Sequence, residues 1–385
     1  MKIGISTLIV RPNKSASNEA YLIGLIDALL RYDQKNAYTL YVTPQNKVRF
    51  RQMEWDGVTY HTMPKIVNNR FVRIIFDQFV IPIFALIHRL DVLHYPGTIG
   101  SIWGIKRTVV SIHYELDKFH LPSVSLLKRI YFKGLFKLSC KRASSLIVPT
   151  NTFAKSISRE WGIPIEKMWV GVYGSENEKN IDNILIEQAC RNAGLKPGFI
   201  LSVTNELPHK NLIRVLDVYL KLRDQTPATM QLVLIGNISS QYLEKYFEGI
   251  RAAGKDITYE NDIINLGFVP NEQVLPFYNK AAMLLNPSLS ESLGITVIEA
   301  MNGGCPVIAS NIPAHKEIID DAGILIEEDN SEQYMTAMIA MLGDPGVRKL
   351  YIEKGRERAA LFSWEHVADN TVSAYNNAAG VAKAR

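Results

Sequence analysis

The sequence predicts an α/β protein made of two Rossmann-like, doubly wound domains that face a central cleft. Three observations predict this fold class. With 385 residues, the chain is long for one hydrophobic core and suits two domains. Short apolar runs alternate with amphipathic helical patterns, as in parallel sheets covered by helices. The alternation breaks at a polar stretch, 175–196, and then restarts, which indicates a linker between two similar halves.

The first domain is expected over residues 1–174. Its short apolar runs end at polar or turn-forming residues, which favours buried strands over short helices. The predicted strands are 2–6, 39–42, 92–95, 108–112 and 145–149, and the predicted helices are 19–32, 70–89, 123–142 and 152–161.

The second domain is expected over residues 197–363, and a last helix, at about 364–385, is predicted to pack back on the first domain. In open parallel sheets, ligands bind beyond the carboxyl ends of the strands, so we expect the ligand at that edge of the second domain, in the cleft. The predicted strands are 199–203, 231–235, 263–266, 283–286, 307–310 and 323–326, and the predicted helices are 211–223, 240–253, 271–280, 296–301 and 331–341.

The composition is that of an ordinary soluble enzyme. Hydrophobic residues make up 47% of the chain and charged residues 21%, which excludes a disordered chain. The three cysteines, Cys140, Cys190 and Cys305, lie far apart, which favours neither a disulfide framework nor a metal site and indicates a reducing compartment. Met1 runs directly into a predicted strand, unlike a signal peptide. We therefore expect a cytoplasmic protein.

The positive charge is concentrated in the first half of the chain. Residues 1–175 carry 24 Lys and Arg against 11 Asp and Glu, whereas acidic residues predominate after them. In the segments 70–76 and 128–137, basic residues alternate with large apolar ones, as in helices that lie in a membrane interface. An anionic membrane surface, or a lipid-linked phosphate acceptor, therefore fits better than nucleic acid as the partner. The alternative is that these Lys and Arg residues only solvate the outer faces of packed helices.

The strongest functional signal is the stretch 287–299, which reads P-S-L-S-E-S-L-G-I-T-V-I-E. It places Glu291 in a loop before a predicted helix and Glu299 about one turn inside that helix. A helix N-terminus presents free N–H groups and a partial positive charge, which suit a phosphate. Two carboxylates beside such a site are placed to accept hydrogen bonds from sugar or ribose hydroxyls. The combination points to a nucleotide-sugar.

Several motifs in a fixed order extend this signal over most of the chain. They are L-S-V-T-N-E-L-P-H-K-N at 201–211, I-N-L-G-F-V-P at 264–270, the P-S-x-x-E-x-x-G-x-x-x-x-E block at 287–299, A-M-N-G-G-C-P-V-I-A-S at 300–310 and F-S-W at 362–364. With them, the chain resembles the retaining GT-B glycosyltransferases of family 4, also called glycosyltransferases group 1.

The resemblance implies an enzyme, a metal-independent retaining glycosyltransferase of the hexosyltransferase type. Such an enzyme moves a sugar from a nucleotide-diphosphate sugar to a glycan or a polyprenyl-diphosphate-linked acceptor, without a cofactor. It also implies bacterial surface-polysaccharide synthesis, with the enzyme peripheral on the inner face of the cell membrane.

The resemblance also assigns roles to residues of the second domain. Glu299 would hold the ribose hydroxyls, and Glu291 would contact the donor sugar near its 3-hydroxyl and stabilise charge at the anomeric carbon. Lys210, predicted at a helix start, would bind the diphosphate. The remaining donor contacts would be backbone N–H groups of Leu293, Gly294 and Ile295, and Phe268 and Val269 beside the base. Phe268 is equally well interpreted as a core aromatic residue.

Five positions depart from the family pattern or carry a weaker signal. Asn205 stands where the family has a second diphosphate-binding arginine, and Ser292 stands where it has a glycine. His113, at a strand end, would contact the 6-hydroxyl of the donor sugar, but the family's following aspartate is replaced by Tyr114. Ser17 replaces a glycine-rich loop and is a candidate contact to the diphosphate or acceptor.

Two rival functions remain open at this point. A GT-B nucleotide-sugar epimerase would need catalytic carboxylates or histidines in the first domain, where no convincing set is found. The departures from the pattern leave open a second alternative, a non-catalytic partner subunit that is a degenerate member of the family. Motifs of P-loop proteins, zinc proteases and serine hydrolases do not occur in the sequence.

Overall fold

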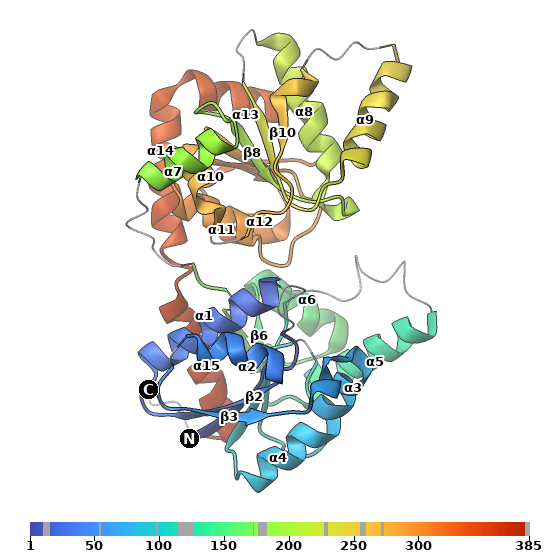
Figure 1. Cartoon of the computed structure of the whole chain (residues 1–385), viewed down its shortest axis with the longest axis vertical. Coiled ribbons are helices and arrows are strands. Elements are labelled where there is room, and N and C mark those ends of the chain that lie inside the picture. Colours follow the sequence, from blue (N-terminus) through green and yellow to red (C-terminus); the bar gives the residue numbers. More distant parts are fainter. Residues whose placement is uncertain are drawn as a thin grey trace. The chain divides into compact units, whose positions relative to one another are not determined.

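The computed structural model describes the chain except for residues 11–15, 54, 98, 114–125, 172, 176–182, 227–229, 255–258, 271–272 and 382–385. It consists of two compact units (Figure 1). The first contains Met1–Gly174 and Phe362–Arg385, and the second contains Ser175–Leu361.

The first unit is built on a parallel sheet of seven strands in the order β3-β2-β1-β4-β5-β6-β7. The order runs outward from β1 in one direction and then restarts at β4 on its other side, which makes the sheet doubly wound. Its strands are β1 (Lys2–Ser6), β2 (Ala37–Val42), β3 (Val58–Thr62), β4 (Val92–Tyr95), β5 (Thr108–Ser111), β6 (Ser145–Val148) and β7 (Met168–Val170).

Helices cover both faces of this sheet, because successive strand side chains point to opposite sides. Leu40 of β2 packs with the helices of one face, while its neighbour Tyr41 packs with those of the other. The first face is covered by α1 (Ala16–Tyr32), α2 (Pro44–Arg51) and α15 (Trp364–Ala379). The second face is covered by α4 (Ile81–Ile87), α5 (Leu126–Arg142) and α6 (Asn151–Trp161). The C-terminal helix α15 is thus part of the first unit, where the Tyr375 hydroxyl lies 2.8 Å from His94 Nδ1.

The second unit has a parallel sheet of six strands in the order β10-β9-β8-β11-β12-β13. Its strands are β8 (Ile200–Val203), β9 (Leu232–Ile235), β10 (Ile263–Asn265), β11 (Met283–Asn286), β12 (Val307–Ser310) and β13 (Ile324–Ile326). With two parallel, doubly wound sheets, the predicted fold class is confirmed.

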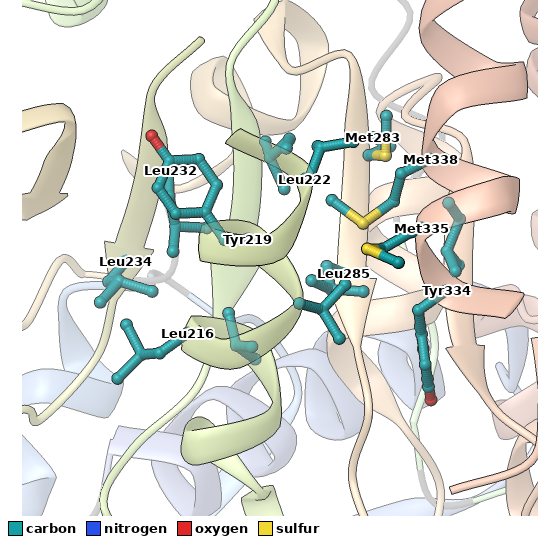
Figure 2. Packing of buried hydrophobic residues seen from close by; sticks show 14 of the residues in the cluster. Leu216, Tyr219, Leu222, Leu232, Leu234, Met283, Leu285, Tyr334, Met335 and Met338 are labelled. Carbon is teal, nitrogen blue, oxygen red and sulfur yellow. The ribbon is translucent and has the colours of Figure 1, made fainter. Parts of the chain in front are cut away.

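On one face of this sheet, α8 (Leu212–Gln225), α9 (Ser240–Ala252) and α13 (Ser331–Gly343) form the core. Figure 2 shows Leu222 of α8 and Met335 and Met338 of α13 close to Leu285 of β11. The remaining helices are α7 (Asn183–Asn192), α10 (Leu275–Lys280), α11 (Ile295–Asn302), α12 (Pro313–Ile319) and α14 (Pro345–Ala359), and contacts link α7 to α10 and both α11 and α12 to α14. The close packing of this core holds the strand ends, and therefore the loops that follow them, in fixed positions.

Two local expectations from the sequence need correction. The predicted linker, 175–196, contains helix α7, which packs on α10 and so belongs to the second unit. The single helix predicted at 70–89 consists of α3 (Arg70–Ile75), a π-helical turn (Phe76–Val80) and α4. The overall polarity of 175–196 hides the apolar residues of 183–192, and a uniform helical period does not predict the π turn.

Candidate functional site

The second sheet has its switch point between β8 and β11. From β8 the chain runs outward through β9 and β10, and it returns to the other side of β8 at β11. The loops after β8 and β11 therefore diverge from neighbouring strand ends. In sheets of this kind, that is where ligands bind.

The loops after β8 and β11 are tied to each other by hydrogen bonds. The backbone N–H of Leu289 donates to the carbonyl of His209 at 2.7 Å, and Asn211 Nδ2 donates to the carbonyl of Pro287 at 3.1 Å. Asn211 has a φ of 52°, in the left-handed region that asparagine tolerates better than most residues. Its turn separates the short helix Pro208–Lys210 from α8 and directs Lys210 toward the β11 loop.

Lys210 and Glu291 form an ion pair at this point. Lys210 Nζ donates to Glu291 Oε1 at 2.6 Å, and the two side chains are only 20% and 11% exposed. Burial, the largest single influence, acts to raise the pKa of the Glu291 carboxyl, but the Lys210 ammonium together with His315 and Ser288 outweighs it, so the pKa lies below its ordinary value. Glu291 is therefore held ionised in a largely buried position.

The loop from β11 to α11 is ordered by side chains of its own. Asn286 Oδ1 accepts hydrogen bonds from the Ser288 backbone N–H at 3.3 Å and from Ser288 Oγ at 2.7 Å. Gly294 caps α11 with a φ of 91°, which favours glycine. The first N–H groups of a helix have no acceptor within the helix, so those at the start of α11 are available to an anion.

Glu299 lies inside α11, one turn beyond this start, and is partly buried. Its Oε2 accepts a hydrogen bond from the Tyr278 hydroxyl of α10 at 3.2 Å. The structure therefore orients the second carboxylate through a neighbouring helix, while Glu291 is oriented by Lys210.

One buried side chain of this site, His315, was not expected from the sequence. It is the third residue of α12, directly after β12, and it is fully buried. A Cβ placed on Gly294 would lie 3.4 Å from His315 Cδ2 and 3.7 Å from Nε2, so the ring borders the loop that carries Gly294. The only signal in the sequence was a histidine in the turn after a buried strand, 307–310, at the same edge as Glu291.

Three other predicted contacts belong to neighbouring loops. Asn205 Oδ1 accepts a hydrogen bond from the Leu207 N–H at 2.9 Å, so its side chain closes a turn in the β8 loop. Phe268 follows β10 and is 67% exposed, which excludes its alternative role as a core residue. Val269, next to it, is partly buried. The β10 loop is joined to the end of β9, where the Gly236 N–H donates to the Gly267 carbonyl at 2.8 Å.

The two candidates of the first half lie in the other unit. His113 follows β5; its Nε2 donates to the Pro96 carbonyl at 2.7 Å, and its ring meets that of Tyr21 edge to face. Burial lowers the pKa of His113 to about 4. Ser17 lies in the first turn of α1, while Tyr114 lies outside the described residues. In the part of the chain that the structure describes, no three His, Cys, Asp or Glu side chains are grouped as metal ligands.

Comparisons with known proteins show similarity to glycosyltransferases. Residues 187–358 match the family of glycosyl transferases group 1. The O-antigen chain mannosyltransferase RfbU of Salmonella typhimurium is 24% identical over 300 residues, which are 76% of this chain and 79% of the relative. A glycosyltransferase of Rickettsia africae has a similar structure, with a TM-score of 0.71 at 16% identity over 98% of each chain. Anabaena HepE, solved in complex with UDP, reaches 0.68 at 15% identity over 97% of this chain and 98% of its own.

Proposed function

Because the chain is a group 1 glycosyltransferase with the GT-B fold, we propose that it is a retaining, metal-independent enzyme whose donor is a nucleotide-diphosphate sugar. The observation that carries the proposal is the Lys210–Glu291 pair, held at the switch point of the second sheet beside the start of α11. It combines a cation, an ionised carboxylate and free helix N–H groups within one small region.

Each part of this region has a proposed task. The diphosphate binds at the start of α11, where the N–H groups of Leu293, Gly294 and Ile295 and the Lys210 ammonium stabilise its charge. Glu299 accepts hydrogen bonds from the ribose hydroxyls. Glu291 lies toward the sugar and stabilises positive charge at the anomeric carbon as the diphosphate leaves. The acceptor hydroxyl then attacks from the same face and loses its proton to the departing phosphate, so no protein base is assigned.

We propose that Phe268, Val269 and His113 also contact the donor. Phe268, which is exposed, and Val269 border the base, and His113 contacts the donor sugar's 6-hydroxyl. For the acceptor, the relative's name, an O-antigen chain mannosyltransferase, supports a lipid-linked glycan of a bacterial surface polysaccharide.

An exposed apolar stripe supports a membrane surface as the place of action. Phe71, Ile75, Phe79, Ile83 and Ile87 recur at every fourth residue from α3 to α4, and each is at least 45% exposed. Four residues of α-helix turn about 40° more than a full turn, so such a stripe would wind around the helix. The π-helical turn at Phe76–Val80 takes up additional residues per turn and rotates the stripe back. Figure 1 shows α3 and α4 at the edge of the first unit.

The exposed charges of the segment that includes this stripe, residues 65–107, suit an anionic lipid surface. The acidic residues of the segment, Asp77 and Asp91, accept hydrogen bonds from Ser6 Oγ and the Lys2 N–H. The exposed charged residues of the same segment are basic: Lys65, Arg89, Lys106 and Arg107. Apolar side chains that enter the interface beside basic ones that meet lipid phosphates would hold the enzyme on the surface. None of the helices that the structure describes is long and apolar enough to span a bilayer.

Donor binding and turnover test the proposed activity. In a thermal-shift screen with UDP-, GDP-, ADP- and dTDP-sugars, one nucleotide class should raise the melting temperature, and the protein should then hydrolyse or transfer that sugar. Glu291→Gln should lower turnover at least a hundredfold, and Lys210→Met should weaken binding and turnover together. The matched controls are Glu248→Gln and Lys245→Met, both exposed on α9.

The rival functions predict different results. A non-catalytic subunit would show neither nucleotide binding nor hydrolysis, and an epimerase would change the sugar without releasing the nucleoside diphosphate. Wild-type turnover in both site variants would disprove the assignment of the site.

Vesicle binding tests the membrane surface separately. The protein should bind phosphatidylglycerol vesicles at low salt, bind phosphatidylcholine vesicles weakly, and be released at high salt. The double variant Ile87→Ser and Phe79→Ser should weaken vesicle binding about tenfold, since each substitution removes apolar surface that would be buried in the lipid interface. Ile213→Ser, a similarly exposed residue of α8, is the control. Equal binding of all variants, or equal binding to both lipids, would refute this surface.

A further inference from the structure

His315 has a buried nitrogen without a hydrogen-bond partner. The side chain is fully buried, yet its Nε2 has no partner among the described residues. An unsatisfied buried polar atom costs about 1–3 kcal/mol, so such atoms are rare and need a reason. Here the atom lies beside the Gly294 loop, which the proposed function gives to the donor.

The hydrogen bonds of the other ring nitrogen determine the tautomer. His315 Nδ1 lies 2.9 Å from the carbonyl oxygen of Ser310, an atom that can only accept. The Ser310 hydroxyl, 3.2 Å from the same nitrogen, donates its own proton to the Ser288 carbonyl. Nδ1 must therefore carry the hydrogen, and in a neutral ring Nε2 is then a bare acceptor.

The surroundings keep the ring neutral. Burial lowers the pKa of His315 below its ordinary value, and the Lys210 ammonium acts in the same direction, while Glu291 and the Ser310 carbonyl oppose them without reversing the shift. A neutral Nε2 can accept a hydrogen bond but cannot donate one. An unprotonated phosphate oxygen has no hydrogen to donate to Nε2, whereas a hydroxyl group has one.

We propose that His315 Nε2 accepts a hydrogen bond from a hydroxyl group of the donor sugar, held over Gly294 next to Glu291. The inference rests on the proposed function and gives it a further binding residue. Glu291 and His315 together present two acceptors to the sugar, and the start of α11 presents donors to the diphosphate. His315 thereby selects for a hydroxyl at one position of the sugar and keeps phosphate oxygens away from that position.

The test compares each nucleoside diphosphate with its sugar conjugate. The variant His315→Leu has an apolar side chain of similar volume but no acceptor, and it should bind UDP and GDP as the wild type does. It should bind UDP-glucose or GDP-mannose, whichever the wild type prefers, about tenfold more weakly, as expected for one lost hydrogen bond of about 1.4 kcal/mol. His366→Leu, on α15 of the other unit, is the matched control and should leave all four affinities unchanged.

A second measurement does not require the variant to fold. In ¹⁵N-labelled wild-type protein, the Nε2 resonance of His315 should be that of an unprotonated nitrogen, and it should shift with the nucleotide-sugar but not with the nucleoside diphosphate. Equal loss of UDP and UDP-glucose affinity in His315→Leu, or an Nε2 that stays unchanged with the sugar or carries a proton, would overturn the inference. If the wild type bound none of these nucleotides, the proposed function itself would fail, and this inference with it.

Discussion

Replacing Lys210 by methionine should destabilise the second unit, because it leaves a buried carboxylate without its counter-ion. At the N–O distance of 2.6 Å, the attraction is about 6 kcal/mol for an effective dielectric constant of about 20. Most of it offsets the cost of removing both charges from water, and removal of one partner of such a pair costs about 3–5 kcal/mol. Since these side chains keep some exposure, we expect about 3 kcal/mol. For a domain of this size, that lowers the melting temperature by about 6–12 °C.

The pH dependence distinguishes this cause from a general packing defect. In the wild type, the folded-state pKa of Glu291 is lowered, so its contribution to stability is present above the ordinary carboxyl pKa and is lost as the pH falls through the folded value. In Lys210→Met, burial acts without the ammonium and raises that pKa. The variant then gains stability from protonating Glu291 as the pH falls, so its difference from the wild type should be largest near pH 7–8 and should shrink toward pH 4.

Thermal melts from pH 4 to pH 8, followed by circular dichroism, measure both effects. Lys245→Met is the control for loss of a lysine, and Lys210→Met combined with Glu291→Gln should recover most of the lost stability, since no buried charge remains. A difference in melting temperature below about 2 °C, or one that is the same at pH 4 and pH 8, would refute the reasoning.

Three further variants test other parts of the structure. Asp77→Asn should raise the melting temperature at pH 7.5 but not at pH 4, because burial raises the pKa of Asp77 to about 6 and its ionisation above that pH costs about 2–3 kcal/mol; an equal effect at both pH values would contradict this. Gly294→Ala should destabilise by about 1–2 kcal/mol, measured by denaturant unfolding, because its φ of 91° lies in the left-handed region that residues with a Cβ disfavour; a neutral effect would mean that the loop can rearrange. Tyr278→Phe should raise the dissociation constant for the nucleotide about threefold, by calorimetry, since Glu299 loses a hydrogen bond that orients it; unchanged affinity would remove Glu299 from the ribose site.

The central strands could be predicted from the sequence because they are buried on both faces. Strands β11 and β12 read as continuous apolar runs, and the structure places them at the predicted residues, 283–286 and 307–310. The edge strands β3 and β7 were missed, because each is half-exposed and carries polar residues or has only three residues.

The candidate site divides in the same way. Glu291, Gly294 and Glu299 belong to one continuous stretch, so their spacing alone indicated a helix start with two carboxylates. The ion pair joins Lys210 to a residue 81 positions away, and His315 comes from a third loop. Such contacts depend on which strands are neighbours in the sheet. The order of the elements along the chain does not determine which strands are neighbours.

The position of Asn205 has a consequence for how the proposed donor binds. Asparagine is neutral, so it supplies no charge where the family has an arginine, and its side chain instead completes a turn of the β8 loop. Lys210, five residues later, is meanwhile paired with Glu291. A diphosphate that binds at the start of α11 therefore competes with Glu291 for the same ammonium, because like charges cannot both be fully neutralised by it. If the phosphate drew Lys210 toward itself, donor binding would weaken the ion pair between Lys210 and Glu291. The Glu291 carboxylate could then stabilise charge at the anomeric carbon. Under the proposed function, the ion pair would keep Glu291 ionised until the donor binds, and donor binding would then free the carboxylate.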